Sequence, residues 1–202
     1  RPEPMPQIPF EREWSTMVRA YDEPAVALRE APCSLPSRQG PCRSLFRRPG
    51  VALTAQPLTA GSLQRAIAPV GAGAASVVHL SAHGVRECLV LEDGQGTAHF
   101  LGCDMLRRIL DLRCGRGESA GGGAPSAAPR LVVLNACSLS AVGAQFVQGG
   151  VPHVICSAAD LRDSAGLVFL QSLYGSLFQG SSVARAFDAA RVALRSSAEH
   201  FA

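Results

Sequence analysis

Two short apolar stretches constrain the fold of this chain more than any other feature, because each leads into a residue type that can do chemistry. Val77–Ser81 is followed by His83, and Leu131–Asn135 is followed by Cys137. Near-continuous apolar runs are typical of strands that are buried on both faces of a parallel sheet. In open α/β sheets, chemistry gathers at the carboxyl ends of the strands, so we expect neighbouring strands to place His83 beside Cys137.

Strand and helix patterns alternate along the rest of the chain. Further strands are predicted at residues 51–55 and 151–157, and the second apolar stretch begins at 130. Helical periodicity predicts helices at 102–112, 141–148, 163–178 and 182–197. Asp160 or Asp163 is expected to cap the third of these, and Ser181 or Ser182 the fourth. Thr59 is expected to cap a further helix that runs through Val70. Residues 88–92 and 97–101 flank a glycine-containing turn and predict a hairpin. This alternation indicates an α/β fold with a mostly parallel central sheet.

The first 50 residues carry a much weaker pattern. Four prolines crowd residues 1–9, a short helix is predicted over Glu11–Tyr21, a short strand over Ala25–Leu28, and a long loop over Ala31–Gly50. We therefore divide the chain into a poorly defined segment, residues 1–50, holding a degenerate first strand plus loop, and a folded domain over residues 51–202.

Composition limits the classes of function that need to be considered. The formal net charge is +3, only 17% of residues are charged, and the 19 basic residues, all arginine, are dispersed, so no nucleic-acid partner is expected. No membrane span or signal segment is visible, and we expect a cytoplasmic protein without a membrane partner. Because the first residue is Arg1, we expect a fragment of a longer chain. The seven cysteines form no C-x-x-C pair, which argues against a zinc ribbon and a disulfide framework.

Cys137 and His83 each have a structural as well as a chemical interpretation. An isolated cysteine is most often a small buried apolar residue, and a histidine next to glycine can simply satisfy a loop carbonyl. A catalytic cysteine needs a nearby imidazolium or helix N-terminus to lower the pKa of its thiol, and the predicted position of Cys137 offers both. His79 is interpreted as structural, because a zinc-protease motif would need a helix here. His99 and His153 have no partner motif.

His83 lies roughly 50 residues before Cys137, the spacing that caspases show between their histidine and a Gln-Ala-Cys motif. Here the comparable tripeptide is Asn135-Ala136-Cys137. Between about Val51 and Leu194 the chain resembles the CHAT family, the caspase-like peptidase domains related to separase. The motifs that carry the resemblance are Val78-His79-Leu80-Ser81-Ala82-His83-Gly84, Leu134-Asn135-Ala136-Cys137-Ser138, Gly149-Gly150-Val151-Pro152-His153-Val154-Ile155, and Asp163-Ser164-Ala165 followed by Leu173-Tyr174, Leu177 and Gly180.

The resemblance implies a caspase-like three-layer α/β/α sandwich and a cysteine endopeptidase that needs no metal or other cofactor. In it His83 acts as general base and then acid, Cys137 is the nucleophile, and the backbone N–H groups of Gly84 and Cys137 form the oxyanion hole. The partners implied are a protein or peptide substrate and regulatory domains in the same longer chain. The alternative is a catalytically inactive, CHAT-like protein-interaction module.

The chain departs from the pattern of the family it resembles at residues that concern substrate recognition. Many caspase relatives that cut after basic residues carry aspartate two positions before the cysteine, and Asn135 stands there in this chain. Asp160 and Asp163 follow the next strand, where they are candidates for contacting a basic side chain of the substrate, or for capping a helix.

Overall fold

The computed structural model describes residues 10–22, 46–48, 51–68, 75–85, 87–93, 97–114, 128–158 and 163–198. Three parallel strands form the main sheet in the order β3-β7-β8, with bounds β3 (Val77–Ser81), β7 (Leu131–Asn135) and β8 (His153–Cys156). All three were predicted to within a few residues. The central strand β7 is the most apolar, and its first four residues are all buried.

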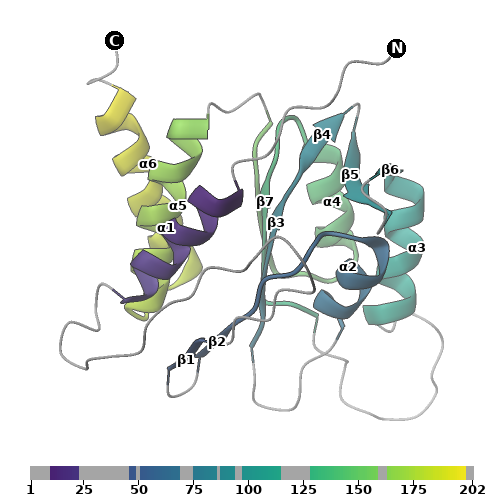
Figure 1. Cartoon of the computed structure of the whole chain (residues 1–202), viewed down its shortest axis with the longest axis horizontal. Coiled ribbons are helices and arrows are strands. Elements are labelled where there is room, and N and C mark those ends of the chain that lie inside the picture. The colour runs from purple at the N-terminus through teal and green to yellow at the C-terminus, as the bar shows by residue number, and fades with distance from the viewer. Residues whose placement is uncertain are drawn as a thin grey trace.

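Helices cover both faces of this sheet (Figure 1). One face is covered by α2 (Ala60–Ala66), α3 (Cys103–Cys114) and α4 (Ser140–Gln148). The other is covered by α1 (Phe10–Asp22), α5 (Asp163–Phe178) and α6 (Val183–Ala198). Alternate residues of β7 enter the two cores, Val132 and Leu134 on the first face and Leu131 and Val133 on the second. The predicted α/β class is therefore confirmed.

Capping and chain breakers set the ends of several helices. Thr59 caps α2 as predicted, since its hydroxyl oxygen accepts a hydrogen bond from the backbone N–H of Ser62. The helix was expected to continue through Val70 but ends at Ala66, because the residue before Pro69 is disfavoured in helical conformation. Ser182 caps α6, accepting a hydrogen bond from the backbone N–H of Arg185 at 3.4 Å.

A second, antiparallel sheet lies just past the end of β3. It contains β4 (His83–Val85), β5 (Cys88–Glu92) and β6 (Ala98–Leu101) in that order. The β5–β6 hairpin was predicted. Strand β4 was not, because it is three residues long and follows β3 after a single residue, Ala82, so its pattern merges with that of β3.

The predicted loop over Ala31–Gly50 is wrong at residues 46–48, where the chain forms β1 (Phe46–Arg48). This strand pairs antiparallel with β2 (Val51–Leu53), which was predicted as a strand but does not join the parallel sheet. The Pro49-Gly50 dipeptide between them is a turn signal that should have suggested a hairpin. The predicted helix over Glu11–Tyr21 is confirmed as α1. The predicted strand over Ala25–Leu28 lies outside the described residues.

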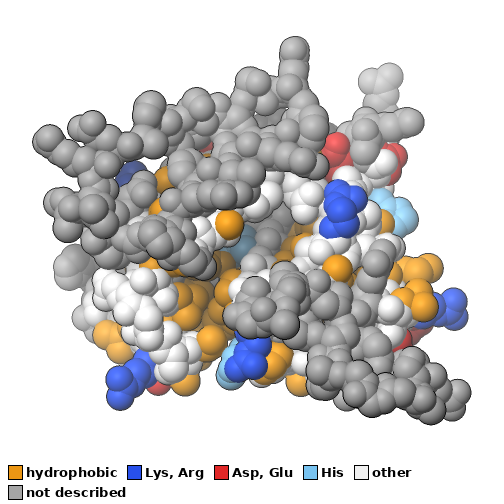
Figure 2. Space-filling model, turned by 90° about the horizontal axis from the view of Figure 1, so that it is seen from below, with side chains coloured by type: hydrophobic (Ala, Val, Ile, Leu, Met, Phe, Trp, Pro, Cys, Tyr) orange, Lys and Arg blue, Asp and Glu red, His pale blue; other side chains and the backbone are white. Residues whose placement is uncertain are grey.

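Where side chains are coloured in Figure 2, hydrophobic residues are interspersed with a few arginines and acidic residues. This agrees with a chain in which only 17% of residues are charged. Among the helices of the described ranges, none combines the length and the apolar character that a bilayer crossing requires.

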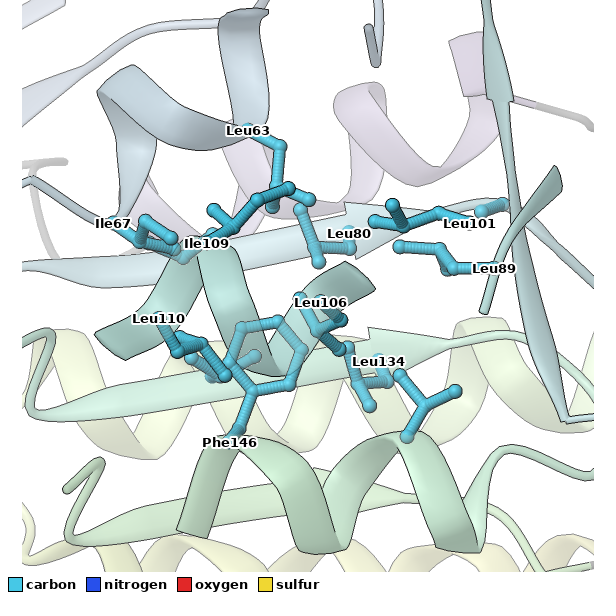
Figure 3. Close-up of a cluster of buried hydrophobic side chains, with 14 of the residues drawn as sticks. Leu63, Ile67, Leu80, Leu89, Leu101, Leu106, Ile109, Leu110, Leu134 and Phe146 are labelled. Carbon is cyan, nitrogen blue, oxygen red and sulfur yellow. The ribbon is translucent and has the colours of Figure 1, made fainter. Parts of the chain in front are cut away.

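The larger core lies between the sheet and helices α2, α3 and α4 (Figure 3). Phe146 of α4 is its largest fully buried side chain and lies close to Leu110 and Leu106 of α3 in the close-up. Gly149, at the end of α4, allows close approach to Leu110, since a Cβ there would lie only 3.0 Å from the Leu110 Cβ. This packing holds α4, and with it the turn that precedes α4, against the sheet.

We predict that Phe146→Ala lowers the free energy of unfolding by about 3–5 kcal/mol, because it removes a buried ring and leaves a cavity. Urea denaturation followed by circular dichroism measures the loss. Val147→Ala is the matched control, since Val147 is the next residue of the same helix and is 55% exposed. A similar loss in both variants would contradict the packing described.

Candidate active site

The carboxyl ends of β3 and β7 lie side by side at one edge of the sheet, next to β4 (Figure 1). The parallel register pairs Ser81 with Asn135, the last residue of each strand. One step further, the backbone N–H of Ala82 donates to the carbonyl oxygen of Asn135 at 3.4 Å. The segments that lead to His83 and Cys137 therefore leave the sheet from adjacent positions.

Gly84 brings these two segments into direct backbone contact. A Cβ at this position would overlap the carbonyl oxygen of Cys137 and would approach the Leu139 side chain to 2.8 Å. Real Cβ atoms do not make such contacts, so only glycine fits. The residue next to His83 thus packs on the peptide unit of Cys137 itself.

We predict that Gly84→Ala lowers the free energy of unfolding by about 1–3 kcal/mol, the usual cost of forcing extra atoms into a packed site. Guanidinium unfolding monitored by circular dichroism measures it. Gly175→Ala serves as control, because nothing lies within 4 Å of a Cβ at Gly175 and alanine favours the helix α5. Equal stability of the Gly84→Ala and wild-type proteins would show that the contact is absent in solution.

Cys137 lies in a tight turn between β7 and α4, and it is half-buried. The next residue, Ser138, has φ of 51°, a left-handed conformation that costs a non-glycine residue about 1–2 kcal/mol. On the far side of the turn, the Leu139 backbone N–H donates to the Ser157 carbonyl oxygen at 3.1 Å, just past the end of β8. The turn is therefore held from two directions, by β4 and by β8, in a conformation that it would not adopt alone.

His83 is the first residue of β4 and is half-buried. It lies at the exit of β3, as expected, and there it begins the antiparallel sheet, directly opposite Val90 of β5. Helix α4 begins at Ser140, three residues after Cys137, close to the predicted start at 141. The N-terminus of α4 is thus close to the cysteine in the chain, and His83 is the residue before Gly84, which contacts the Cys137 carbonyl. The assignment of His83 and Cys137 as a catalytic pair stays a prediction.

Two other cysteines, Cys156 and Cys103, lie in surroundings that disfavour the thiolate form. Burial raises the pKa of the Cys156 thiol, and a Cβ at Gly143 would lie only 2.8 Å from its sulfur. Burial also raises the pKa of the Cys103 thiol, with the nearby charge of Glu87 adding to the effect. These two thiols fit the interpretation of most cysteines as small, poorly reactive residues. Within the described ranges, no group of three or more histidine, cysteine or acidic side chains is placed to hold a metal ion.

His79 is held in a buried polar network, which supports its interpretation as a structural residue. Its Nδ1 lies 2.9 Å from the hydroxyl of Tyr174 in α5, and its Nε2 lies 3.3 Å from Oε2 of Glu13 in α1. Glu13 and Tyr174 are only 3% and 5% exposed. The network joins two helices to β3, four residues before His83.

Sequence reasoning missed Glu13, although a signal was available. Glu13 lies on the same face of the predicted helix as Met17 and Ala20, at a spacing of three to four residues, and so on the side that packs on the protein. A carboxylate on a buried face needs a partner, because an unpaired buried charge is very costly.

Tyr174 makes the stability of the protein sensitive to high pH. Burial, with the Glu13 carboxylate adding to it, raises the pKa of Tyr174 above its usual range. An unfolded tyrosine ionises near pH 10, so above about pH 10 the unfolded chain releases a proton that the folded protein retains. The stability contributed by this neutral phenol is complete below about pH 10 and is lost as the pH rises further.

We predict that between about pH 10 and 11.5 the free energy of unfolding falls more steeply in the wild type than in Tyr174→Phe. The difference in slope should approach about 1.4 kcal/mol per pH unit, the value for one proton. Denaturant titrations of both proteins at stepped pH measure it. Parallel curves would show that Tyr174 ionises freely in the folded protein.

The structure describes only part of the predicted substrate-binding residues. Asn135 ends β7 at the site and is half-buried, and its backbone carbonyl holds Ala82. Asp160 lies outside the described residues. Asp163 is the first residue of α5, but its side chain is also outside the described part of the chain. A role for any of these side chains in recognition remains a prediction.

The fold and the site define an α/β domain in which a histidine segment and a cysteine segment meet at the carboxyl edge of a parallel sheet. The family model of the CHAT domain matches residues 16–201, nearly the whole chain, and the protein therefore belongs to the CHAT-domain family, a caspase-like family. This confirms the resemblance found in the sequence. A comparison with curated proteins finds no significant match.

Proposed function

We propose that this protein is a cysteine endopeptidase with a caspase-like α/β/α sandwich, in which Cys137 and His83 cleave peptide bonds of a protein substrate. The observation that carries the proposal is the contact of Gly84 with the Cys137 carbonyl, which joins the two segments that bear the proposed pair. Membership of a caspase-like family supports the same reaction class. Control by further domains of a longer chain belongs to the proposal as well.

The proposed reaction begins with proton transfer from the Cys137 thiol to His83, after which the thiolate attacks the scissile carbonyl carbon. Collapse of the tetrahedral intermediate breaks the C–N bond, and His83 returns its proton to the leaving amine. A water molecule then attacks the thioester, giving its proton to His83 and its hydroxyl to the acyl carbon. Release of the carboxylic acid product restores the thiol.

Two features of the turn suit Cys137 to the role of nucleophile. The start of α4 presents backbone N–H groups with a partial positive charge, which favour a nearby thiolate. The strained conformation at Ser138 holds the cysteine where β7 ends, and strained turns of this kind are common at catalytic residues.

The oxyanion hole is assigned to the backbone N–H groups of Gly84 and Cys137. Such donors stabilise the transition state when they are fixed in advance, and losing one usually costs about 2.7–4 kcal/mol in activation free energy. The tight packing of Gly84 on Cys137 keeps both peptide units in place.

We predict that Cys137→Ala abolishes cleavage of a peptide pool, while Cys156→Ala retains it. Cys156 is the matched control because it ends the neighbouring strand β8 and its pKa is raised by burial. Mass spectrometry of the pool before and after incubation detects new termini. Cleavage that persists in Cys137→Ala would falsify the proposal.

We also predict that His83→Ala slows alkylation of Cys137 by iodoacetamide at pH 7 by at least about tenfold, because the imidazole no longer accepts the thiol proton. Peptide mapping after timed quenching gives the rate at each cysteine. An unchanged rate at Cys137 would favour the alternative function, an interaction module that keeps the fold without the chemistry.

A further inference from the structure

A row of three residues crosses the antiparallel sheet beside the candidate active site. His83 of β4 lies directly opposite Val90 of β5, and Val90 lies directly opposite Phe100 of β6. Side chains that are directly opposite in an antiparallel pair project from the same face. The imidazole of the proposed general base is therefore the first member of a row whose other members are apolar.

The two faces of this sheet differ sharply in burial. The neighbouring row, Gly84, Leu89 and Leu101, packs inward, with Leu89 fully buried and Leu101 only 2% exposed. On the face of His83, Phe100 is 53% exposed. Val85, two residues from His83 and on the same face, is 38% exposed.

The core does not account for these exposed side chains. Val90, which is half-buried, lies between the two on the same face and joins them into one apolar surface. A single exposed apolar residue needs no explanation, but an apolar surface next to a proposed active site is typical of a binding surface. An aromatic ring is especially effective there, because it contributes a large apolar area with little loss of side-chain freedom.

We propose that Val85, Val90 and Phe100, which we call the outer row, bind the part of a polypeptide substrate that follows the scissile bond, and that they select large apolar side chains there. This inference rests on the proposed peptidase function. His83 must protonate the leaving amine, so the leaving segment lies on the His83 side of Cys137. From His83, the outer row continues away from Cys137 across β5 and β6.

The dimensions of the sheet agree with this assignment. Adjacent strands are about 4.8 Å apart, so Val90 and Phe100 lie roughly 5 and 10 Å from the backbone of His83. An extended substrate advances about 3.3 Å per residue. The first or second residue after the scissile bond therefore reaches Val90, and the third reaches Phe100.

The test is a series of peptides that share one sequence before the cleaved bond and carry leucine, phenylalanine, serine or aspartate at the first three positions after it. In the wild type, kcat/KM should be at least about tenfold higher for the apolar members than for the serine member. Phe100→Ser should bring that ratio close to 1, and Phe100→Leu should restore most of it. A ratio that Phe100→Ser leaves unchanged overturns the proposal.

Val192→Ser is the control, because Val192 is 62% exposed on α6, away from this sheet, and it should keep the wild-type ratio. Unfolding curves of each variant verify that it is folded, which is expected because Phe100 is half exposed.

A binding experiment separates failure of this inference from failure of the proposed function. If the wild type cleaves no peptide, the methyl NMR signals of Val85 and Val90 are followed in Cys137→Ala while the free peptide Leu-Phe-Leu-Ser-Gly is added. Shifts confined to these methyl groups, and absent with Ser-Ser-Ser-Ser-Gly, support the binding surface even without cleavage. No shift with either peptide overturns it.

Discussion

The parallel pairing of β3 with β7 determines where every residue of the candidate site lies. With Leu80 opposite Leu134 and Ser81 opposite Asn135, both strands end at the same level, and the chains that leave them meet at Gly84 and Cys137. A slip of one residue would turn each side chain to the other face of the sheet. In β3 such a slip would move Val78 and Leu80 out of the first core and bring His79 into it, away from Glu13 and Tyr174. The difference between the two faces therefore keeps the register in place.

The two histidines near the end of β3 lie in different surroundings. His79 projects toward α1 and α5, where Glu13 and Tyr174 engage both of its ring nitrogens. His83 comes only four residues later, yet it belongs to a different sheet, because the chain changes partners at Ala82. Two histidines that look alike in the sequence thus have unlike surroundings, and only one of them lies next to the cysteine turn.

Much of this architecture could be predicted from apolar periodicity. Burial alone determines the regular apolar patterns of the main elements. These elements are the strands Val77–Ser81 and Leu131–Asn135 and the helices at 163–178 and 183–198. Two short strands were not predicted, Phe46–Arg48 and His83–Val85. A strand of three residues depends on the strand it pairs with more than on its own composition.

The candidate site was only partly visible in the sequence for a related reason. The order and spacing of His83 and Cys137 suggested that they meet at the sheet edge. Three other features depend on contacts between segments far apart in the chain. They are the positive φ of Ser138, the absence of space for a side chain at Gly84, and the pairing of Glu13 with His79. No local pattern contains that information. The burial of Glu13 is the exception, since a carboxylate on the apolar side of a helix already demands a partner.

The arrangement of α1, α5 and α6 has a consequence for the order in which the protein is completed during synthesis. Leu131 and Val133 pack on the second face of the sheet against Leu170, Leu173, Ala186 and Ala190, all of which come later in the chain. The first face, by contrast, is closed by α2, α3 and α4, all of which end before residue 150. Because the ribosome makes the chain from its N-terminus, the helices that cover the first face are complete before those that cover the second.

In that interval α1 has been made but lacks α5, the helix against which it packs. The nascent domain therefore passes through a stage with one finished core and one bare apolar surface, a state in which association with a chaperone or with another chain competes with folding.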